Sequence, residues 1–173
     1  MSQLSSLSFT SSIDSSLLVR DVAGSYRPAE PAEVLQAALR VLAGQLRGTE
    51  MLSSPQAVRD FLRIKLGTLE HEVFAVIHLD AQHRVIEYVE MFRGTVTQTS
   101  VYPREVVKEA MTHNTAAIVL VHNHPSGVAE PSRADEHLTQ TLKSALSLVD
   151  VRVIDHLIVA GPTILSMAEC GLI

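Results

Sequence analysis

Two histidines and one aspartate stand at a spacing that suits a metal ion. An apolar, β-branched run at 116–121 leads directly into His122-Asn123-His124 and predicts a buried strand. Because side chains alternate between the faces of a strand, His122 and His124 would point one way and Asn123 the other. Asp135 follows, just inside a predicted helix. Two imidazoles and one carboxylate make a three-ligand zinc set, and its fourth position is left for water, as in catalytic zinc sites.

The residues between the histidine pair and Asp135 support this interpretation. Pro125 and Gly127 indicate a turn directly after the strand. Ser132 and Asp135 form a Ser-x-x-Asp pattern, which is typical of a helix start. A His-x-His pair alone is more often solvated or hydrogen-bonded at a strand end, so the prediction depends on the whole arrangement.

The longer string resembles a known family. His-x-His-Pro followed by Ser-x-x-Asp is similar to the JAMM motif of MPN-type metallopeptidases. The fuller string His-Asn-His-Pro-Ser-Gly…Glu-Pro-Ser-x-x-Asp resembles the RadC family in particular, as do Tyr-Pro-Arg-Glu at 102–105 and Asp-His-Leu-Ile-Val at 155–159. The resemblance covers about residues 53–173. It implies a cytidine-deaminase-like MPN domain, in which a mixed β-sheet carries helices on its faces.

A zinc-activated water needs a base that accepts its proton and returns it to the leaving group. The resemblance implies that Glu72 has this role, since the Glu of a Glu-x-Phe step matches the catalytic Glu of RadC-like chains. Glu70 competes with it, because both residues would face the same side if the following strand extended back. The position of Phe74 favours Glu72.

Ser132 has two candidate roles. Its side chain can cap the helix that follows, and the resemblance implies that it helps to hold the oxyanion of the reaction intermediate. The two roles can coexist only if the hydroxyl is free to donate toward the site, and a metal-binding Asp135 is not expected to be a plain capping-box acid. Asn123 is expected to brace the loop at most, and His156 is interpreted as a hydrogen-bonded core histidine and not as a ligand.

The order of the predicted helices and strands indicates an α+β or α/β domain with a mostly mixed sheet, and the resemblance implies that this α+β fold is an α/β sandwich. A flexible Ser-rich leader is expected at 1–30, an amphipathic helix extension at 31–50 and the RadC-like domain at 53–173. Helices are predicted at 31–46, from 53 onward through 66, at 103–113 and at 132–149. Strands are predicted at 73–79, 84–92, 95–101, 116–121 running on to the histidines, 151–159 and 163–167.

Composition limits the possible partners. The chain has 173 residues, with 14 Lys and Arg against 19 Asp and Glu, and its net charge of −5 argues against a general nucleic-acid binder. No apolar run approaches the roughly 18 residues of a membrane span, and no secretory signal is evident. A single cysteine, Cys170, fits a reducing cytoplasm. We therefore expect a cytoplasmic protein with a peptide or protein substrate, no membrane contact and no direct DNA binding.

Two functions remain open at this stage. The first is a zinc-dependent hydrolase of the JAMM type that cleaves a peptide or isopeptide bond. The second is a non-catalytic metal-binding accessory protein of DNA repair or recombination, although residues 1–50 lack the Gly hairpin of the helix-hairpin-helix module that RadC-like chains usually carry. The letters His-Asn-His also suggest HNH nucleases, but those sites spread their residues over a ββ-helix-metal unit.

Overall fold

The computed structural model describes residues 17–48, 55–94 and 100–173. The chain divides into two compact units, Met1–Ala38 and Leu39–Ile173. The division falls inside helix α1 (Pro31–Leu46), whose bounds agree with the predicted helix at 31–46.

The first unit contains a small hairpin that the sequence analysis did not predict. Strands β1 (Leu18–Arg20) and β2 (Tyr26–Pro28) pair in antiparallel register. The turn closes because Asp21 accepts the backbone N–H of Ser25 at 2.9 Å. Most side chains of both strands are exposed, so no alternation of apolar residues signals them. Residues 17–30 are therefore not wholly without structure, while the rest of the expected leader lies outside the described residues.

The second unit is built on a five-stranded sheet with the order β4-β3-β5-β6-β7. Strands β5 and β6 are parallel, and the other neighbours are antiparallel. The bounds of the strands are β3 Val73–Leu79, β4 Val85–Arg93, β5 Ala117–Asn123, β6 Arg152–Ala160 and β7 Thr163–Ser166. The bounds of the helices are α2 Pro55–Leu66, α3 Pro103–Thr112 and α4 Arg133–Ser147. This mixed sheet with helices confirms the predicted α+β fold.

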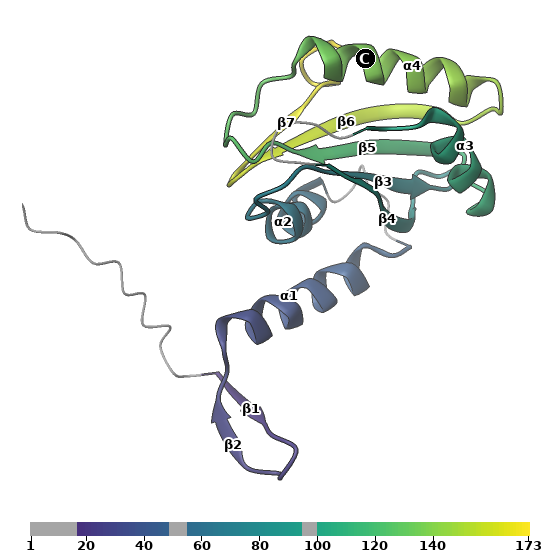
Figure 1. Cartoon of the computed structure of the whole chain (residues 1–173). Coiled ribbons are helices and arrows are strands. Elements are labelled where there is room, and N and C mark those ends of the chain that lie inside the picture. The colour runs from purple at the N-terminus through teal and green to yellow at the C-terminus, as the bar shows by residue number, and fades with distance from the viewer. Residues whose placement is uncertain (1–16, 49–54, 95–99) are drawn as a thin grey trace, which may run out of the picture. The chain divides into compact units, whose positions relative to one another are not determined.

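Helices cover both faces of the sheet. Figure 1 shows α4 along one face and α2 on the opposite face. Strands β3 and β5 are buried over their whole length, which explains why they are continuous apolar runs. Their even-numbered side chains, such as Phe74 and Leu120, pack toward α3 and α4, and odd-numbered ones such as Val119 pack toward α2. By this alternation His122 lies on the α3/α4 face.

Several predicted boundaries fall differently in the structure. The strand predicted at 95–101 lies mostly outside the described residues, and positions 100 and 101 are not in a strand. The serine cap predicted for the second helix, at 53–54, also lies outside them. Within the described parts of the chain, no helix combines the length and apolar character that crossing a bilayer requires.

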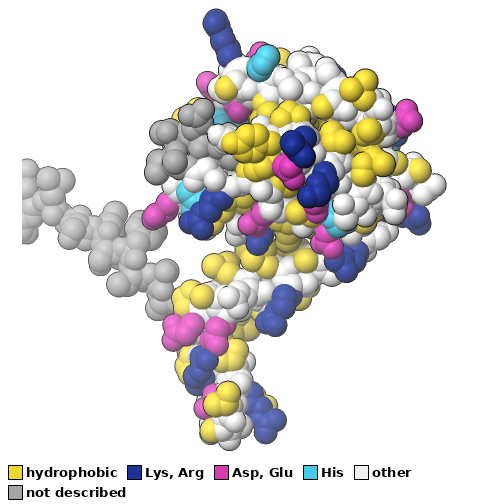
Figure 2. Space-filling model, turned by 45° about the vertical axis from the view of Figure 1, so that its right-hand side comes forward, with side chains coloured by type: hydrophobic (Ala, Val, Ile, Leu, Met, Phe, Trp, Pro, Cys, Tyr) yellow, Lys and Arg dark blue, Asp and Glu magenta, His cyan; other side chains and the backbone are white. Residues whose placement is uncertain are grey.

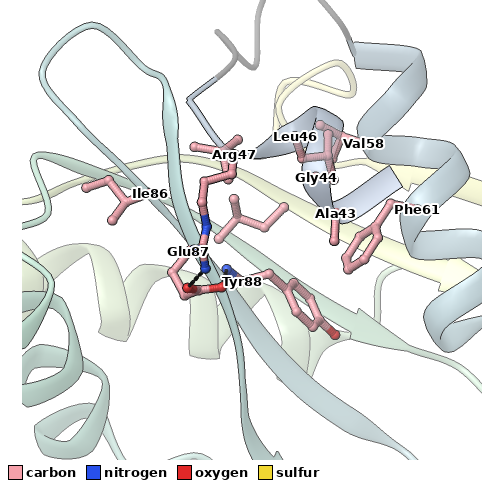
Figure 3. A pocket seen from close by; sticks show the side chains of 11 residues that line it. Ala43, Gly44, Leu46, Arg47, Val58, Phe61, Ile86, Glu87 and Tyr88 are labelled. Carbon is pink, nitrogen blue, oxygen red and sulfur yellow. Dashed lines mark hydrogen bonds and ion pairs between the residues drawn. The ribbon is translucent and has the colours of Figure 1, made fainter. Parts of the chain in front are cut away.

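A cavity of about 380 Å³ lies in the second unit, between the end of α1, α2 and β4. Figure 3 shows apolar side chains such as Val58 and Phe61 along its wall, with Tyr88 from β4. An ion pair joins Arg47 to Glu87 at its edge. None of the lining residues belongs to the predicted metal site, so this cavity is separate from it.

Candidate metal centre

The three predicted ligands come from a strand end and a helix start. His122 is the penultimate residue of β5, and Asp135 lies in the first turn of α4. His124 directly follows β5, and its backbone N–H donates to the carbonyl of Val159 at 2.8 Å. Gly127, with φ +79°, then turns the chain away. The strand therefore ends where the two histidines need to lie, and the turn brings the chain back toward α4.

The ligand atoms converge at the spacing that a metal requires. His122 Nε2 lies 2.9 Å from His124 Nε2 and 3.2 Å from Asp135 Oδ1, and His124 Nε2 lies 3.6 Å from Asp135 Oδ2. Zinc bonds of about 2.0–2.2 Å place neighbouring ligands of a tetrahedron roughly 3.3–3.6 Å apart. The longest of the three distances falls in that range and the other two lie below it, and all of the ligand atoms are close enough together for these three residues to hold a metal ion.

The side chain of His124 is oriented by the loop that follows it. Its Nδ1 lies 2.8 Å from the carbonyl oxygen of Val128. A carbonyl can only accept, so Nδ1 carries the proton and Nε2 of the neutral ring presents its lone pair to the site. This is the tautomer that a metal ligand needs.

The charge distribution of the site favours a cation. Burial alone would raise the pKa of the Asp135 carboxyl, but the adjacent imidazoles of His122 and His124 and the hydroxyl of Ser132 hold that pKa well below its ordinary value. The hydrogen bond with Asp135 raises the pKa of His124 against the effect of burial, and the charge of Glu72 adds to the rise. A carboxylate and a second nearby acid therefore act on the His124 imidazole.

Asp135 takes part in a complete capping box as well. Its Oδ2 accepts from the backbone N–H of Ser132 at 2.7 Å and from the Ser132 hydroxyl at 2.6 Å, and Ser132 Oγ accepts from the Asp135 N–H at 3.2 Å. Asp135 Oδ1 meanwhile faces His122. Asp135 is thus a capping-box acid, which was not expected of a metal ligand, while its Oδ1 stays directed at His122 and its Oδ2 lies 3.6 Å from His124 Nε2. The Ser132 hydroxyl, however, donates to Asp135 and is not free.

Glu72 lies beside the histidines through the pairing of β3 with β5. Phe74 is paired with His122, so Glu72, directly before β3, and His124, directly after β5, both lie at this end of the paired strands. The chain bends at Glu70 and β3 begins only at Val73. The strand therefore does not extend back to Glu70, so strand alternation does not place Glu70 and Glu72 on one face.

His156 contacts the proposed ligand His122, and this contact was not predicted from the sequence. This residue of β6 is fully buried, and its Nε2 lies 2.8 Å from Nδ1 of His122. Its other nitrogen lies 2.7 Å from the hydroxyl of Thr139 on α4. Burial holds the pKa of His156 well below its ordinary value, so the ring is neutral. As predicted, it is a hydrogen-bonded core histidine, but its partner is one of the proposed ligands. The feature of the sequence that could have indicated this contact is a histidine inside an apolar strand.

Comparison with known proteins agrees with the architecture. Residues 52–172 match the family described as RadC-like JAB domain. A UPF0758 protein of Leptothrix cholodnii is 59% identical over 150 residues, which is 87% of this chain and 68% of that relative. A UPF0758 protein of Polaromonas sp. is 59% identical over 150 residues, 87% of this chain and 67% of the relative. A UPF0758 protein of Acidovorax sp. is 60% identical over the same share of this chain and 63% of its own length. The chain belongs to the RadC-like JAB domain family.

Proposed function

We propose that this chain is a zinc-dependent hydrolase of the JAMM type, which cleaves a peptide or isopeptide amide bond. The observation that carries the proposal is the convergence of two imidazole Nε2 atoms and one carboxylate, which lie 2.9–3.6 Å from one another. A JAB domain is compatible with a hydrolase. Three protein ligands, with a position left over, are the arrangement of catalytic zinc sites.

His122, His124 and Asp135 would hold the zinc ion in this proposal. When bound, the ion would polarise the amide carbonyl and make water a better nucleophile. The protein supplies the orientation, since His124 is fixed by the Val128 carbonyl and Asp135 by the capping box of α4. Fixed ligands of this kind reduce the reorganisation that the reaction requires.

Glu72 would accept the proton of the attacking water and pass it to the leaving nitrogen. Its position directly before β3, where Phe74 pairs with His122, and the effect of its charge on the pKa of His124 support this role. An acid–base group of this kind contributes a rate factor of about 10²–10⁴. We infer that Glu72, and not Glu70, has this role.

Ser132 would stabilise the oxygen of the tetrahedral intermediate only after its hydroxyl turns away from Asp135 Oδ2, to which it donates at 2.6 Å. Donation to an oxyanion is worth around 3 kcal/mol of barrier. The capping bond from the Asp135 N–H to Ser132 Oγ can persist during that rotation, because there the oxygen only accepts.

The surface charge agrees better with a protein substrate than with nucleic acid. The face in Figure 2 carries Lys and Arg side chains interspersed with Asp and Glu side chains and apolar ones. The whole chain has a net charge of −5. Nucleic-acid binding draws most of its affinity from concentrated basic surface.

A peptide library read by mass spectrometry tests the proposal. The zinc-loaded protein should cleave peptides or isopeptide-linked peptides, and Glu72→Gln should lose at least about 100-fold in rate while it still binds zinc. Glu70→Gln is the matched control and should keep its activity. If the zinc-loaded wild type cleaves no more than Glu72→Gln, the hydrolase proposal is wrong and a non-catalytic metal-binding role takes its place.

A further inference from the structure

Two buried side chains link the strand that carries His122 to the helix that carries Asp135. His156 and Thr139 are both fully buried, and they lie in series behind His122. The chain of contacts runs from the Asp135 carbonyl to the Thr139 hydroxyl (2.6 Å), then to His156 Nδ1 (2.7 Å), and from His156 Nε2 to His122 Nδ1 (2.8 Å). Every step has hydrogen-bond length.

The Asp135 carbonyl, at the start of this chain of contacts, determines the direction of every hydrogen bond that follows. The Asp135 carbonyl can only accept, so the single proton of the Thr139 hydroxyl points to it. The sulfur of Met167, at 3.9 Å, is the weaker competitor for that proton. The Thr139 oxygen therefore accepts from His156 Nδ1–H. A neutral imidazole carries one N–H, so His156 Nε2 is an acceptor and must receive the Nδ1–H of His122.

This order leaves the Nε2 of His122 without a proton. The Val128 carbonyl imposes the same state on His124. When both rings are neutral, two imidazole lone pairs 2.9 Å apart therefore face each other beside the Asp135 carboxylate. A group made only of acceptors is repulsive until a cation lies between them, so the relay behind His122 prepares the site for a metal.

We propose that Thr139 and His156 are positioning residues that fix the metal-binding tautomer of His122. The inference rests on the proposed metal centre. The outer partner of a metal-ligating histidine is commonly a carboxylate, a carbonyl or water. Here it is a neutral ring, which accepts the proton without placing another charge in the core, where an unpaired charge is costly.

The Thr139 oxygen determines which of two neutral tautomeric states the His122–His156 pair adopts. Without its oxygen, His156 Nδ1 loses its acceptor, and a buried unpaired N–H costs about 1–3 kcal/mol. The ring can then move its proton to Nε2 and donate to His122 Nδ1. His122 would in turn carry its proton on Nε2, at the position that the metal needs.

Zinc affinity, measured by competition with a chromophoric chelator, tests the relay in the full chain. Thr139→Val should weaken zinc binding about 10- to 100-fold, and Thr139→Ser, which restores the hydroxyl, should return to near the wild-type affinity. Thr141→Val is the matched control, because Thr141 also donates to a carbonyl of α4, that of His137 at 2.9 Å, on the exposed side. Wild-type zinc affinity in Thr139→Val would overturn the inference.

Ring-nitrogen NMR on metal-free protein gives an independent result. We expect protonated Nδ1 and bare Nε2 on His122, whose signals are told apart from those of His156 by their persistence in His156→Phe. A His122 ring protonated on Nε2 alone would contradict the relay. If the wild type binds no zinc, the metal centre fails, while the protonation pattern of the rings still decides the relay.

Discussion

Asn123 Oδ1 accepts a hydrogen bond from the backbone N–H of Val73 at 2.8 Å, where the paired region of β3 and β5 ends. The amide nitrogen of Asn123 donates to the carbonyl of His71 at 3.0 Å. One side chain thus holds the residues on both sides of Glu72. Because Asn123 lies between His122 and His124, the same tripeptide places both imidazoles on one face and braces the proposed base with the other.

Replacement of Asn123 should loosen the segment around Glu72. Asn123→Ala leaves the buried Val73 N–H and the His71 carbonyl without partners, which should lower the free energy of unfolding by about 1–3 kcal/mol. Hydrogen exchange at the Val73 amide should accelerate accordingly. Asn123→Asp keeps an acceptor for Val73, so that amide should stay more protected than in Asn123→Ala. Unchanged Val73 exchange in the alanine variant would contradict this role.

Gly67, directly after α2, has no room for a side chain. A Cβ there would lie 2.6 Å from the carbonyl oxygen of Arg63 and 2.7 Å from that of Gly161, and both are backbone atoms. Gly67→Ala should therefore destabilise the protein by about 1–3 kcal/mol. Gly44, within α1, has no atom near its added Cβ, and Gly44→Ala should stabilise by up to about 1 kcal/mol. Urea unfolding measures the change in the free energy of unfolding for each variant. Similar changes in Gly67→Ala and Gly44→Ala would contradict the steric explanation.

His78 should make stability depend on acid pH. Burial, and next the charge of His113 stacked on it at 4.7 Å, lower the pKa of His78 from 6.5 to about 4, against the opposing charges of Glu109 and Glu87. The unfolded chain therefore binds a proton on His78 between pH 6.5 and 4 that the folded chain does not. Stability should fall as pH falls through this window, by up to roughly 3 kcal/mol from this group.

The comparison with His78→Leu isolates this effect. The variant lacks the hydrogen bond to Thr115, so its free energy of unfolding should be lower at neutral pH. Between pH 6.5 and 4, however, its free energy of unfolding should decrease less than that of the wild type. His137→Asn, at an exposed position of α4, is the control and should keep the wild-type slope. Equal slopes in His78→Leu and the wild type would show that His78 is not the titrating group.

The parts of the fold that sequence could predict are those with a strong local signal. Strands β3 and β5 are continuous apolar runs because both of their faces are buried. Helix α4 combines a Ser132 cap with a one-sided apolar stripe. The hairpin β1–β2 has neither signal, since its short strands bury almost nothing. Its formation depends on the turn at Asp21, whose hydrogen bond to Ser25 is not visible as periodicity.

The site shows the same difference between local and long-range information. The shared face of His122 and His124 follows from strand alternation, and the sequence analysis predicted it from residues two apart. The contact of His122 with His156 depends instead on the parallel pairing of β5 with β6, which includes a register shift near Val119. Separation along the chain does not specify that register. Thr139 joins the set only because α4 packs over β6.

A crystal of the zinc-loaded protein, with an anomalous difference map measured at the zinc edge, tests the central claim most directly. We expect a single strong peak within about 2.0–2.2 Å of His122 Nε2, His124 Nε2 and an oxygen of Asp135. Crystals of Asp135→Asn grown in the same way should show a much weaker peak there. A map with no peak between the two imidazoles and the carboxylate, or with zinc only elsewhere on the protein, would contradict the proposed metal centre.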